Sequence, residues 1–288
     1  MKPPPFEFRR PGTVDETVAL LAEHGDEAKV LAGGQSLMPL LNMRLAVPSV
    51  VVDVGRLGEL REVAETAAGA TRYGARVVHS DVEDGVVTDR TGGLLRTAAA
   101  GIGYRAIRNR GTLGGSLAHS DASAEWPVVM AALDATVVAR SPRGERSVPC
   151  REFVQGYFTN ALDDDELLVA VDVPTLRDTC RWGMHKAARK PGEFAESLAV
   201  VVAELDGDGA VLRADAWLGA ARDVPVRLTA VEEALVGRRV DEVAAPDVTA
   251  LVIDQLGEPA DPEERYGVHL HGVTVGRAVT DLGLEAKQ

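Results

Sequence analysis

The sequence predicts a globular protein that mixes helices and strands, and three observations support this. The chain has 288 residues, of which 45% are apolar and 26% charged, as in an ordinary soluble domain with a sizeable core. Helix-like and strand-like segments alternate through the first sixty residues, and short strands and loops follow. Two glycine-rich segments, 33–36 and 111–116, interrupt this pattern. Such segments indicate tight backbone turns and a ligand held by backbone groups.

Composition excludes several classes of protein. The net charge of −13 is spread along the chain, so no nucleic-acid partner is expected. No apolar run approaches the roughly 18 residues of a membrane span, and residues 1–5 lack the apolar core of a signal peptide, so we expect a cytoplasmic protein. Two cysteines, Cys150 and Cys180, are too few for a disulfide framework or for the four thiolates of an iron–sulfur cluster.

The first expected element is a helix over residues 13–24. Thr13 can cap it, because Glu16 follows at the spacing of a capping box. Apolar residues recur on one face, and Gly25 is placed to end the helix.

A strand over 29–32 follows and runs directly into the first glycine-rich segment. Ser36 is then the expected cap of a helix over 37–45, and residues 50–54 form the next strand. The first sixty residues therefore predict helix, strand, glycine-rich turn, helix and strand.

The remaining elements are expected from the same patterns. These are short strands and loops from about residue 60, including 74–78; strands at 135–139, 167–173, 197–205 and 211–218; helices at 93–107, 124–133, 226–236 and 268–282; a boundary at 174–179; and a surface excursion at 246–264.

The two glycine-rich segments are the most informative features. Each can bring several backbone N–H groups together with no Cβ in the way, which forms a concave site for an anion. The first also leads into a helix N-terminus, which favours phosphate. One such segment is more often a structural turn than a ligand site. Two of them, about eighty residues apart, favour a dinucleotide whose diphosphate is held from both sides.

The other motifs in the sequence are weaker evidence for a function. Residues 101–106 fit the G-x-G-x-x-G/A pattern, but the preceding run is helical in character, so the strand that a Rossmann site needs is missing. There is no phosphate-binding G-x-x-x-x-G-K-[ST] loop and no G-x-S-x-G elbow. His269 and His271 would share one face of a strand, without a third metal ligand nearby. The basic segment 186–190 is either a solvated turn or a contact to phosphate or an electron-rich ring.

Several of these residues together resemble a known family. Residues 32–37, followed by Arg44-Leu45-Ala46, and residues 107–119 look like the two FAD-binding segments of the medium subunit of molybdenum hydroxylases. That group includes xanthine dehydrogenase, carbon monoxide dehydrogenase, and the quinoline and nicotine oxidoreductases. Further matching segments extend the resemblance over nearly the whole chain: 166–168, 173–174, 186–195 and 224–237.

The resemblance implies an α+β fold of the vanillyl-alcohol-oxidase and molybdenum-hydroxylase type. Two FAD-binding subdomains would span residues 1–60 and 61–176. A C-terminal domain with a three-stranded sheet and helices would span 177–288.

The resemblance also implies which residues hold FAD. Residues 30–37 would wrap the diphosphate and the adenosine side through backbone amides, and residues 112–116 would hold the opposite side of the diphosphate. Glu125 would accept a bond from the ribityl chain, while Ile102, Leu168 and Lys186 would lie at the isoalloxazine, with Lys186 at its pyrimidine edge. The complete set is Val30, Leu31, Ala32, Gly33, Gly34, Gln35, Ser36, Leu37, Ile102, Thr112, Leu113, Gly114, Gly115, Ser116, Glu125, Leu168 and Lys186. No catalytic or metal-binding residue is expected on this chain.

Three of these positions depart from the pattern of some relatives. Ser116 stands where many carry Asn, and Glu125 where the xanthine enzymes carry Asp, so both keep a hydrogen-bonding group. Gln35 stands where carbon monoxide dehydrogenases usually carry His, which argues mildly against carbon monoxide as substrate.

The function implied is electron transfer within a larger hydroxylase. Substrate is oxidised at a molybdenum cofactor on a large subunit, and electrons pass through two [2Fe–2S] clusters on a small subunit to FAD and then to an external acceptor. A dimer of such heterotrimers is the implied assembly.

Two alternatives for the function stay open. A stand-alone FAD oxidase of the same superfamily would have little room for a substrate domain after Pro174, and a flavin-free scaffold would not need two intact glycine-rich segments.

Overall fold

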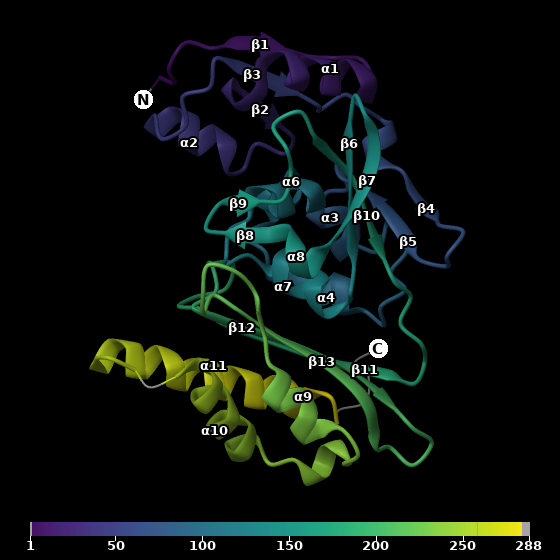
Figure 1. The fold of residues 1–288 in the computed structure, drawn as a ribbon, viewed down its shortest axis with the longest axis vertical. Coiled ribbons are helices and arrows are strands. Elements are labelled where there is room, and N and C mark those ends of the chain that lie inside the picture. The colour runs from purple at the N-terminus through teal and green to yellow at the C-terminus, as the bar shows by residue number, and fades with distance from the viewer. Residues whose placement is uncertain (1, 258, 284–288) are drawn as a thin grey trace.

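The structure is a computed structural model that describes residues 2–257 and 259–283. Its three main sheets follow one another along the chain and along the long axis of the molecule (Figure 1). A three-stranded sheet lies at the N-terminal end, a five-stranded sheet in the middle and a four-stranded sheet at the C-terminal end. The α+β fold class predicted from the sequence is confirmed.

The N-terminal part is a parallel sheet of order β1-β3-β2 with two helices. Because the strands are parallel, their carboxyl ends meet at one edge, which is where ligands bind in open parallel sheets. That edge faces the middle part of the molecule (Figure 1). The elements are β1 (Glu7–Arg9), α1 (Val14–His24), η1 (Gly25–Glu27), β2 (Ala28–Leu31), α2 (Leu37–Met43) and β3 (Val50–Asp53).

Helix α1 forms as the sequence predicts. The Thr13 hydroxyl accepts the Glu16 N–H at 3.1 Å, and the Glu16 carboxylate accepts the N–H of Gly12 at 2.6 Å, one residue earlier than in a standard capping box. Gly25 ends the helix with φ 53°. Helix α2 differs from expectation at both ends. The Ser36 side chain caps none of the described backbone groups, and Arg44, at φ 60°, ends the helix after Met43 rather than at residue 45.

The middle part is an antiparallel sheet of order β4-β5-β10-β6-β7, with α3, α4, α6 and α7 packed on it and a short hairpin, β8–β9, at one side (Figure 1). Its elements are η2 (Glu59–Arg61), β4 (Val63–Glu65), β5 (Thr71–Gly74), α3 (His79–Glu83), α4 (Leu94–Gly101), α5 (Arg105–Arg108), α6 (Leu113–His119), α7 (Glu125–Ala132), β6 (Thr136–Ser141), β7 (Gly144–Pro149), α8 (Cys150–Phe153), β8 (Val154–Gly156), β9 (Thr159–Asn160) and β10 (Leu167–Val173).

One expectation for this part is made more precise and one is wrong. Residues 74–78, expected among short strands and loops, are the last residue of β5 and a loop, because β5 ends at Gly74 and the carbonyls of Ala75 and Val77 accept the first amides of α6. The predicted helix 93–107 is interrupted, because Gly103 adopts φ 51° between α4 and α5. Strand β10 matches its predicted bounds, 167–173.

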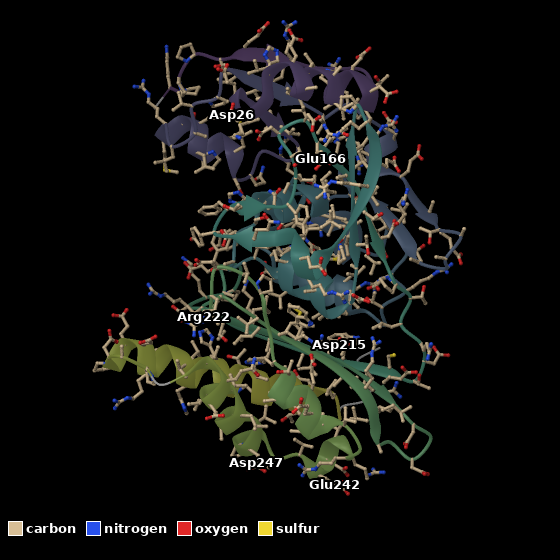
Figure 2. The ribbon with its side chains drawn as sticks, in the orientation of Figure 1. Asp26, Glu166, Asp215, Arg222, Glu242 and Asp247 are labelled. Carbon is tan, nitrogen blue, oxygen red and sulfur yellow. The ribbon has the colours of Figure 1, made fainter. Side chains whose placement is uncertain are left out.

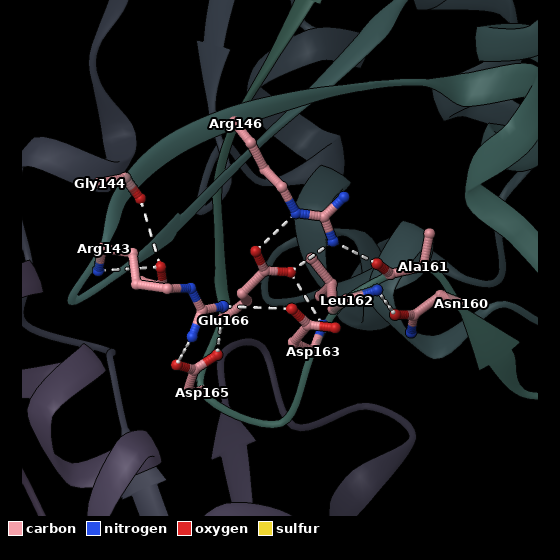
Figure 3. A network of polar contacts seen from close by, with 10 residues as sticks. Arg143, Gly144, Arg146, Asn160, Ala161, Leu162, Asp163, Asp165 and Glu166 are labelled. Atoms are coloured by element: carbon pink, nitrogen blue, oxygen red, sulfur yellow. Dashed lines mark hydrogen bonds and ion pairs between the residues drawn. The ribbon is translucent and has the colours of Figure 1, made fainter.

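An ion-pair network holds the turn that leads into β10 (Figure 3). The Arg146 guanidinium donates to both oxygens of the buried Glu166 carboxylate at 2.6 Å, while Arg143 binds Asp163 and Asp165. Burial alone would raise the pKa of Glu166, but the bonds from Arg146 outweigh it, so the pKa lies below its ordinary value. The network therefore fixes the start of the strand that carries Leu168.

The C-terminal part is a four-stranded antiparallel sheet, β11-β12-β13-β14. The expected sheet had three strands; the fourth, β14, is two residues long. Helix α7 packs on one face of the sheet, and α9 and α11 cover the other face (Figure 1). The elements are β11 (Cys180–Ala187), β12 (Ser197–Leu205), β13 (Val211–Gly219), β14 (Val226–Arg227), α9 (Thr229–Leu235), η3 (Val240–Glu242), α10 (Ala245–Leu256) and α11 (Pro262–Asp281).

Two further expectations are corrected here, and one is confirmed. The surface excursion at 246–264 contains the helix α10, because Pro246 lies in its first turn, where proline is tolerated. The helix expected over 226–236 starts three residues later, after β14. The closing helix expected over 268–282 is confirmed as part of α11, so His269 and His271 do not share one face of a strand, and the His271 ring meets the buried Ser197 hydroxyl at 2.9 Å.

Charged side chains are exposed at both ends of the molecule, as the labelled Asp26 and Asp247 show, whereas the labelled Glu166 is buried in the middle part (Figure 2). Within residues 2–257 and 259–283, no helix is both long and apolar enough to cross a membrane. The same residues contain no cluster of three or more His, Cys, Asp or Glu side chains that could hold a metal ion.

Candidate functional site

The two glycine-rich segments are in direct contact. A Cβ built on Gly33 would lie 2.1 Å from the carbonyl oxygen of Arg110 and 2.9 Å from the Cα of Gly111. A Cβ built on Gly115 would lie 3.7 Å from the Cβ of Ala32. Segments almost eighty residues apart in the sequence thus form one surface, and glycine at position 33 is what allows the two backbones to meet.

The first segment presents a set of unpartnered donors. The backbone N–H groups of residues 33–37 have no acceptor within the described part of the chain, and all five residues are half-buried. The amides of Ser36 and Leu37 are free because they stand at the start of α2, and those of residues 33–35 extend this row of donors, so the segment as a whole can bind an external acceptor. Successive amides around Gly34, whose φ is 76°, form the kind of concavity that binds an anion.

The second segment uses its amides internally. Leu113 and Gly114 donate to the carbonyls of Val77 and Ala75, and the N–H of Gly115 donates to the Thr112 hydroxyl at 3.0 Å. Residues 112–116 are therefore the capped start of helix α6 rather than a free turn. They offer the hydroxyls of Thr112 and Ser116 and a closely packed backbone, while the amide donors lie on the first segment.

His79 supports the second segment from behind. Its ring nitrogen Nδ1 accepts the indole N–H of Trp126 at 3.1 Å, and the backbone N–H of His79 donates to the Gly111 carbonyl at 3.0 Å. Burial, together with the nearby Arg108 guanidinium, lowers the pKa of His79 to about 3, so the ring is neutral. A Cβ at Gly111 would lie 2.8 Å from this ring.

A positively charged cavity adjoins both segments. It has a volume of about 410 Å³ and lies at the carboxyl edge of the parallel sheet, with Gly33 and Thr112 in its wall. Asp53 in the lining is paired with Arg10 at 2.7 Å. The excess of positive charge in a chain of net charge −13 suits phosphate groups. The arginines in the lining are Arg10, Arg56, Arg61, Arg76 and Arg110.

A second group of expected site residues meets where β11 packs on the middle part. The Lys186 ammonium donates to the Glu125 carboxylate at 2.6 Å and to the Gly101 carbonyl at 3.1 Å. Ile102 follows Gly101 directly at the break between α4 and α5. Lys186 therefore lies on a strand and not in a solvated turn, whereas Arg189 and Lys190 of the same basic segment are exposed at the bend that follows β11.

Glu125 is almost fully buried at the first residue of α7. Burial raises the pKa of this carboxyl, the Lys186 charge and hydrogen bond oppose that rise, and the pKa stays above its ordinary value. Buried ionisable groups with a specific charged partner are more frequent at functional sites than elsewhere.

Leu168 is packed differently from these polar residues. It is 4% exposed and belongs to the main apolar cluster, with Ile102 packed against the same cluster. The β10–β6 ladder is irregular directly after Leu168. Its position is consistent with core packing as much as with a contact to a planar ring.

Comparisons with known proteins complete this description. Residues 4–176 match a family model described as the FAD binding domain in molybdopterin dehydrogenase, and residues 182–281 match one described as the CO dehydrogenase flavoprotein C-terminal domain. This chain belongs to that flavoprotein family. The membership predicted from the two glycine-rich segments is confirmed, and the family is one of FAD-binding oxidoreductase subunits.

Individual relatives agree with the family. The chain is 41% identical over 217 residues to 6-hydroxypseudooxynicotine dehydrogenase complex subunit alpha of Paenarthrobacter nicotinovorans, covering 74% of this chain and 72% of the relative. It is 37% identical over 250 residues to caffeine dehydrogenase subunit beta of Pseudomonas sp. (strain CBB1), covering 86% and 84%.

Solved structures show the same fold over the full length. Carbon monoxide dehydrogenase from Hydrogenophaga pseudoflava is similar with a TM-score of 0.89 at 33% identity, and quinoline 2-oxidoreductase from Pseudomonas putida 86 with 0.88 at 34%. Each comparison covers 98% of both chains.

Sequence reasoning identified part of this arrangement and missed the rest. The structure brings residues 31–33 to residues 110–115, and brings Lys186 to Glu125 beside Ile102. Sequence reasoning missed the Gly101 carbonyl, the support from His79 and the arginines of the cavity. Arg10 and Arg56 come shortly after strands of the parallel sheet, and that position was the available signal.

Proposed function

We propose that this chain binds one FAD non-covalently and passes electrons from partner-bound [2Fe–2S] clusters to an external acceptor. The observation that carries the proposal is the set of unpartnered amides at residues 33–37, pressed against the second glycine-rich segment and beside an arginine-lined cavity. Amide donors and arginines together match a diphosphate. FAD, when bound, supplies the redox chemistry.

The chain's own residues would bind and orient the cofactor. Residues 30–37 and 112–116 would hold the diphosphate from two sides, the first through amides and the second through hydroxyls and close packing. Glu125, Ile102, Leu168 and Lys186 would surround the other end, where Lys186 presents a positive charge. Helix α6 begins in the group of residues proposed for the diphosphate, and α7 begins in the group proposed for the other end of the cofactor. Two such separate groups suit an extended dinucleotide.

The partners belong to the same proposal. Relatives are named as a subunit of a dehydrogenase complex and as medium chains of carbon monoxide dehydrogenase. We infer a large subunit with a molybdenum cofactor and a small subunit with two [2Fe–2S] clusters, assembled as a dimer of heterotrimers in the cytoplasm. The three segments 1–60, 61–176 and 177–288 would be the two FAD-binding subdomains and the C-terminal domain.

Release of the cofactor tests the proposal. Acid precipitation of the purified chain should leave flavin in the supernatant, and phosphodiesterase should convert it to FMN. Flavin that stays with the pellet would indicate a covalent link. A chain that holds no flavin, alone or in its complex, would refute the assignment.

A further inference from the structure

The contact between Lys186 and Glu125 joins two different parts of the chain. Lys186 lies on β11 of the C-terminal sheet, whereas Glu125 begins α7 of the FAD-binding domain. Among the ion pairs of residues 2–257 and 259–283, this is the only one that links residues 4–176 to residues 182–281. It is also well shielded, since the two side chains are 15% and 6% exposed.

The geometry constrains Lys186 from two sides. Its ammonium donates to Glu125 at 2.6 Å and to the Gly101 carbonyl at 3.1 Å, which leaves one of its three donors for another acceptor. A lysine side chain is otherwise flexible, because its four-carbon stem adopts many rotamers. Fixed acceptors on α4 and α7 therefore hold the charge at one place on the domain boundary.

We infer that Glu125 is a positioning residue for Lys186, and that the pair together, rather than the lysine alone, sets the charge presented to a bound flavin. This rests on the proposed function, because it assumes that FAD lies beside Lys186. An ionised Glu125 cancels part of the lysine's field at the cofactor. The charged groups facing Glu125 are Lys186, which favours its ionised form, and Asp121, which opposes it.

The inference predicts opposite effects for the two partners. Reduced FAD carries more negative charge than oxidised FAD, so a more positive surrounding favours reduction. Glu125→Gln removes the cancelling charge and should raise the preference for reduced FAD about tenfold, which equals ~30 mV for a two-electron couple. Lys186→Met should change this preference in the opposite direction.

A double-mutant cycle shows whether Glu125 acts through the lysine. Without Lys186, the buried Glu125 carboxyl has no counter-charge and takes up a proton, so Gln adds nothing in that background. The potential of Glu125→Gln/Lys186→Met should therefore equal that of Lys186→Met alone. Spectroelectrochemical titration of the FAD-loaded full chain measures all four proteins.

Glu204→Gln is the matched control. It makes the same change of charge on β12, the strand beside Lys186, but in the β11–β12 register Glu204 lies opposite Cys180 and Lys186 lies opposite Leu198, about 20 Å away along the strand. Its potential should equal that of the wild type.

The possible results distinguish a failure of this inference from a failure of the proposed function. An unchanged potential in Glu125→Gln, or an equal shift with and without Lys186, would overturn the inference. If Glu125→Gln does not retain FAD, Glu125→Asp replaces it, with a smaller shift in the same direction expected because the charge is kept but the shorter side chain places it farther from Lys186, where it cancels less of the lysine's field. Loss of FAD from both variants would assign Glu125 to holding the cofactor and would also overturn the inference. A wild-type chain that binds no FAD would instead refute the proposed function.

Discussion

The carbonyl oxygen of Arg110 occupies the space that a side chain at Gly33 would need, with 2.1 Å between that oxygen and an ideal Cβ. No real Cβ contact is that short, so the two glycine-rich segments can meet only through a residue without a side chain. This contact makes one surface of residues that are far apart in the sequence. Because of this contact, a substitution at Gly33 should affect the stability of the chain as well as FAD binding.

Gly33→Ala should abolish FAD binding and also destabilise the chain. The added methyl group must push the Arg110 backbone away, and such overpacking costs about 1–3 kcal/mol. Flavin content of the purified variant and its urea unfolding check both effects. Gly58→Ala is the control, because a Cβ there meets nothing within 4 Å and the φ of Gly58 is −62°. Full flavin occupancy in Gly33→Ala would show that the contact between segments is not needed for binding.

Lys186→Met should lower the FAD midpoint potential. The substitution keeps the apolar stem and removes the charge, so the preference for reduced FAD should fall about tenfold, or ~30 mV for a two-electron couple. Substrate oxidation by the complex should persist, because that chemistry is proposed for another chain, whereas turnover with the external acceptor should change. A variant that holds FAD at the wild-type potential would make Lys186 a structural lysine only.

His79 should make the chain less stable as the pH falls below its ordinary pKa. The folded-state pKa is lowered to about 3, so the unfolded chain binds one more proton between about pH 6.5 and 3. The free energy of unfolding should therefore fall by up to about 1.4 kcal/mol per pH unit as the pH falls through that window.

His79→Phe should be less stable at pH 7, because it loses the bond from Trp126, but its stability should fall less steeply with acidification. Urea unfolding at pH 7, 6, 5 and 4 measures both slopes. Equal slopes would mean that His79 is accessible to protons in the fold.

The stability that Glu166 contributes should be lost at acidic pH, in a lower pH range than the effect of His79. Its folded-state pKa is depressed, so its stabilising pair with Arg146 is fully present above the unfolded-state value of about 4.3 and is lost as the pH falls through the lower folded-state value. Glu166→Gln should destabilise the chain at pH 7 and have a smaller effect below about pH 4. Asp26→Asn, an exposed substitution in the N-terminal part, is the control (Figure 2). An effect of Glu166→Gln that does not depend on pH would show that packing rather than charge matters there.

Sequence patterns determined the elements whose causes are local. Helix α1 has its cap, its apolar face and its terminal glycine within thirteen residues, and β10 and β12 are apolar runs of strand length, so their positions were predictable. Helix α10 was missed because Pro246 and its acidic neighbours are typical of loops, although proline is equally compatible with a first helical turn. The break at Gly103 was missed because an alanine-rich run favours helix until the backbone is seen to turn.

Family-specific segments also identified the chain as a flavoprotein subunit, since two glycine-rich motifs in the right order are encoded locally. Tertiary structure alone decided which groups carry the site. The pairing of Lys186 with Glu125 spans 61 residues, and the contact of Gly33 with Arg110 joins a loop of the N-terminal part to a loop of the middle part. No local pattern specifies that the amides of 33–37 are left without acceptors while those of 113–116 are used. That difference depends on where Ala75 and Val77 place their carbonyls, because hydrogen bonding is settled by distance in space and not by separation along the chain.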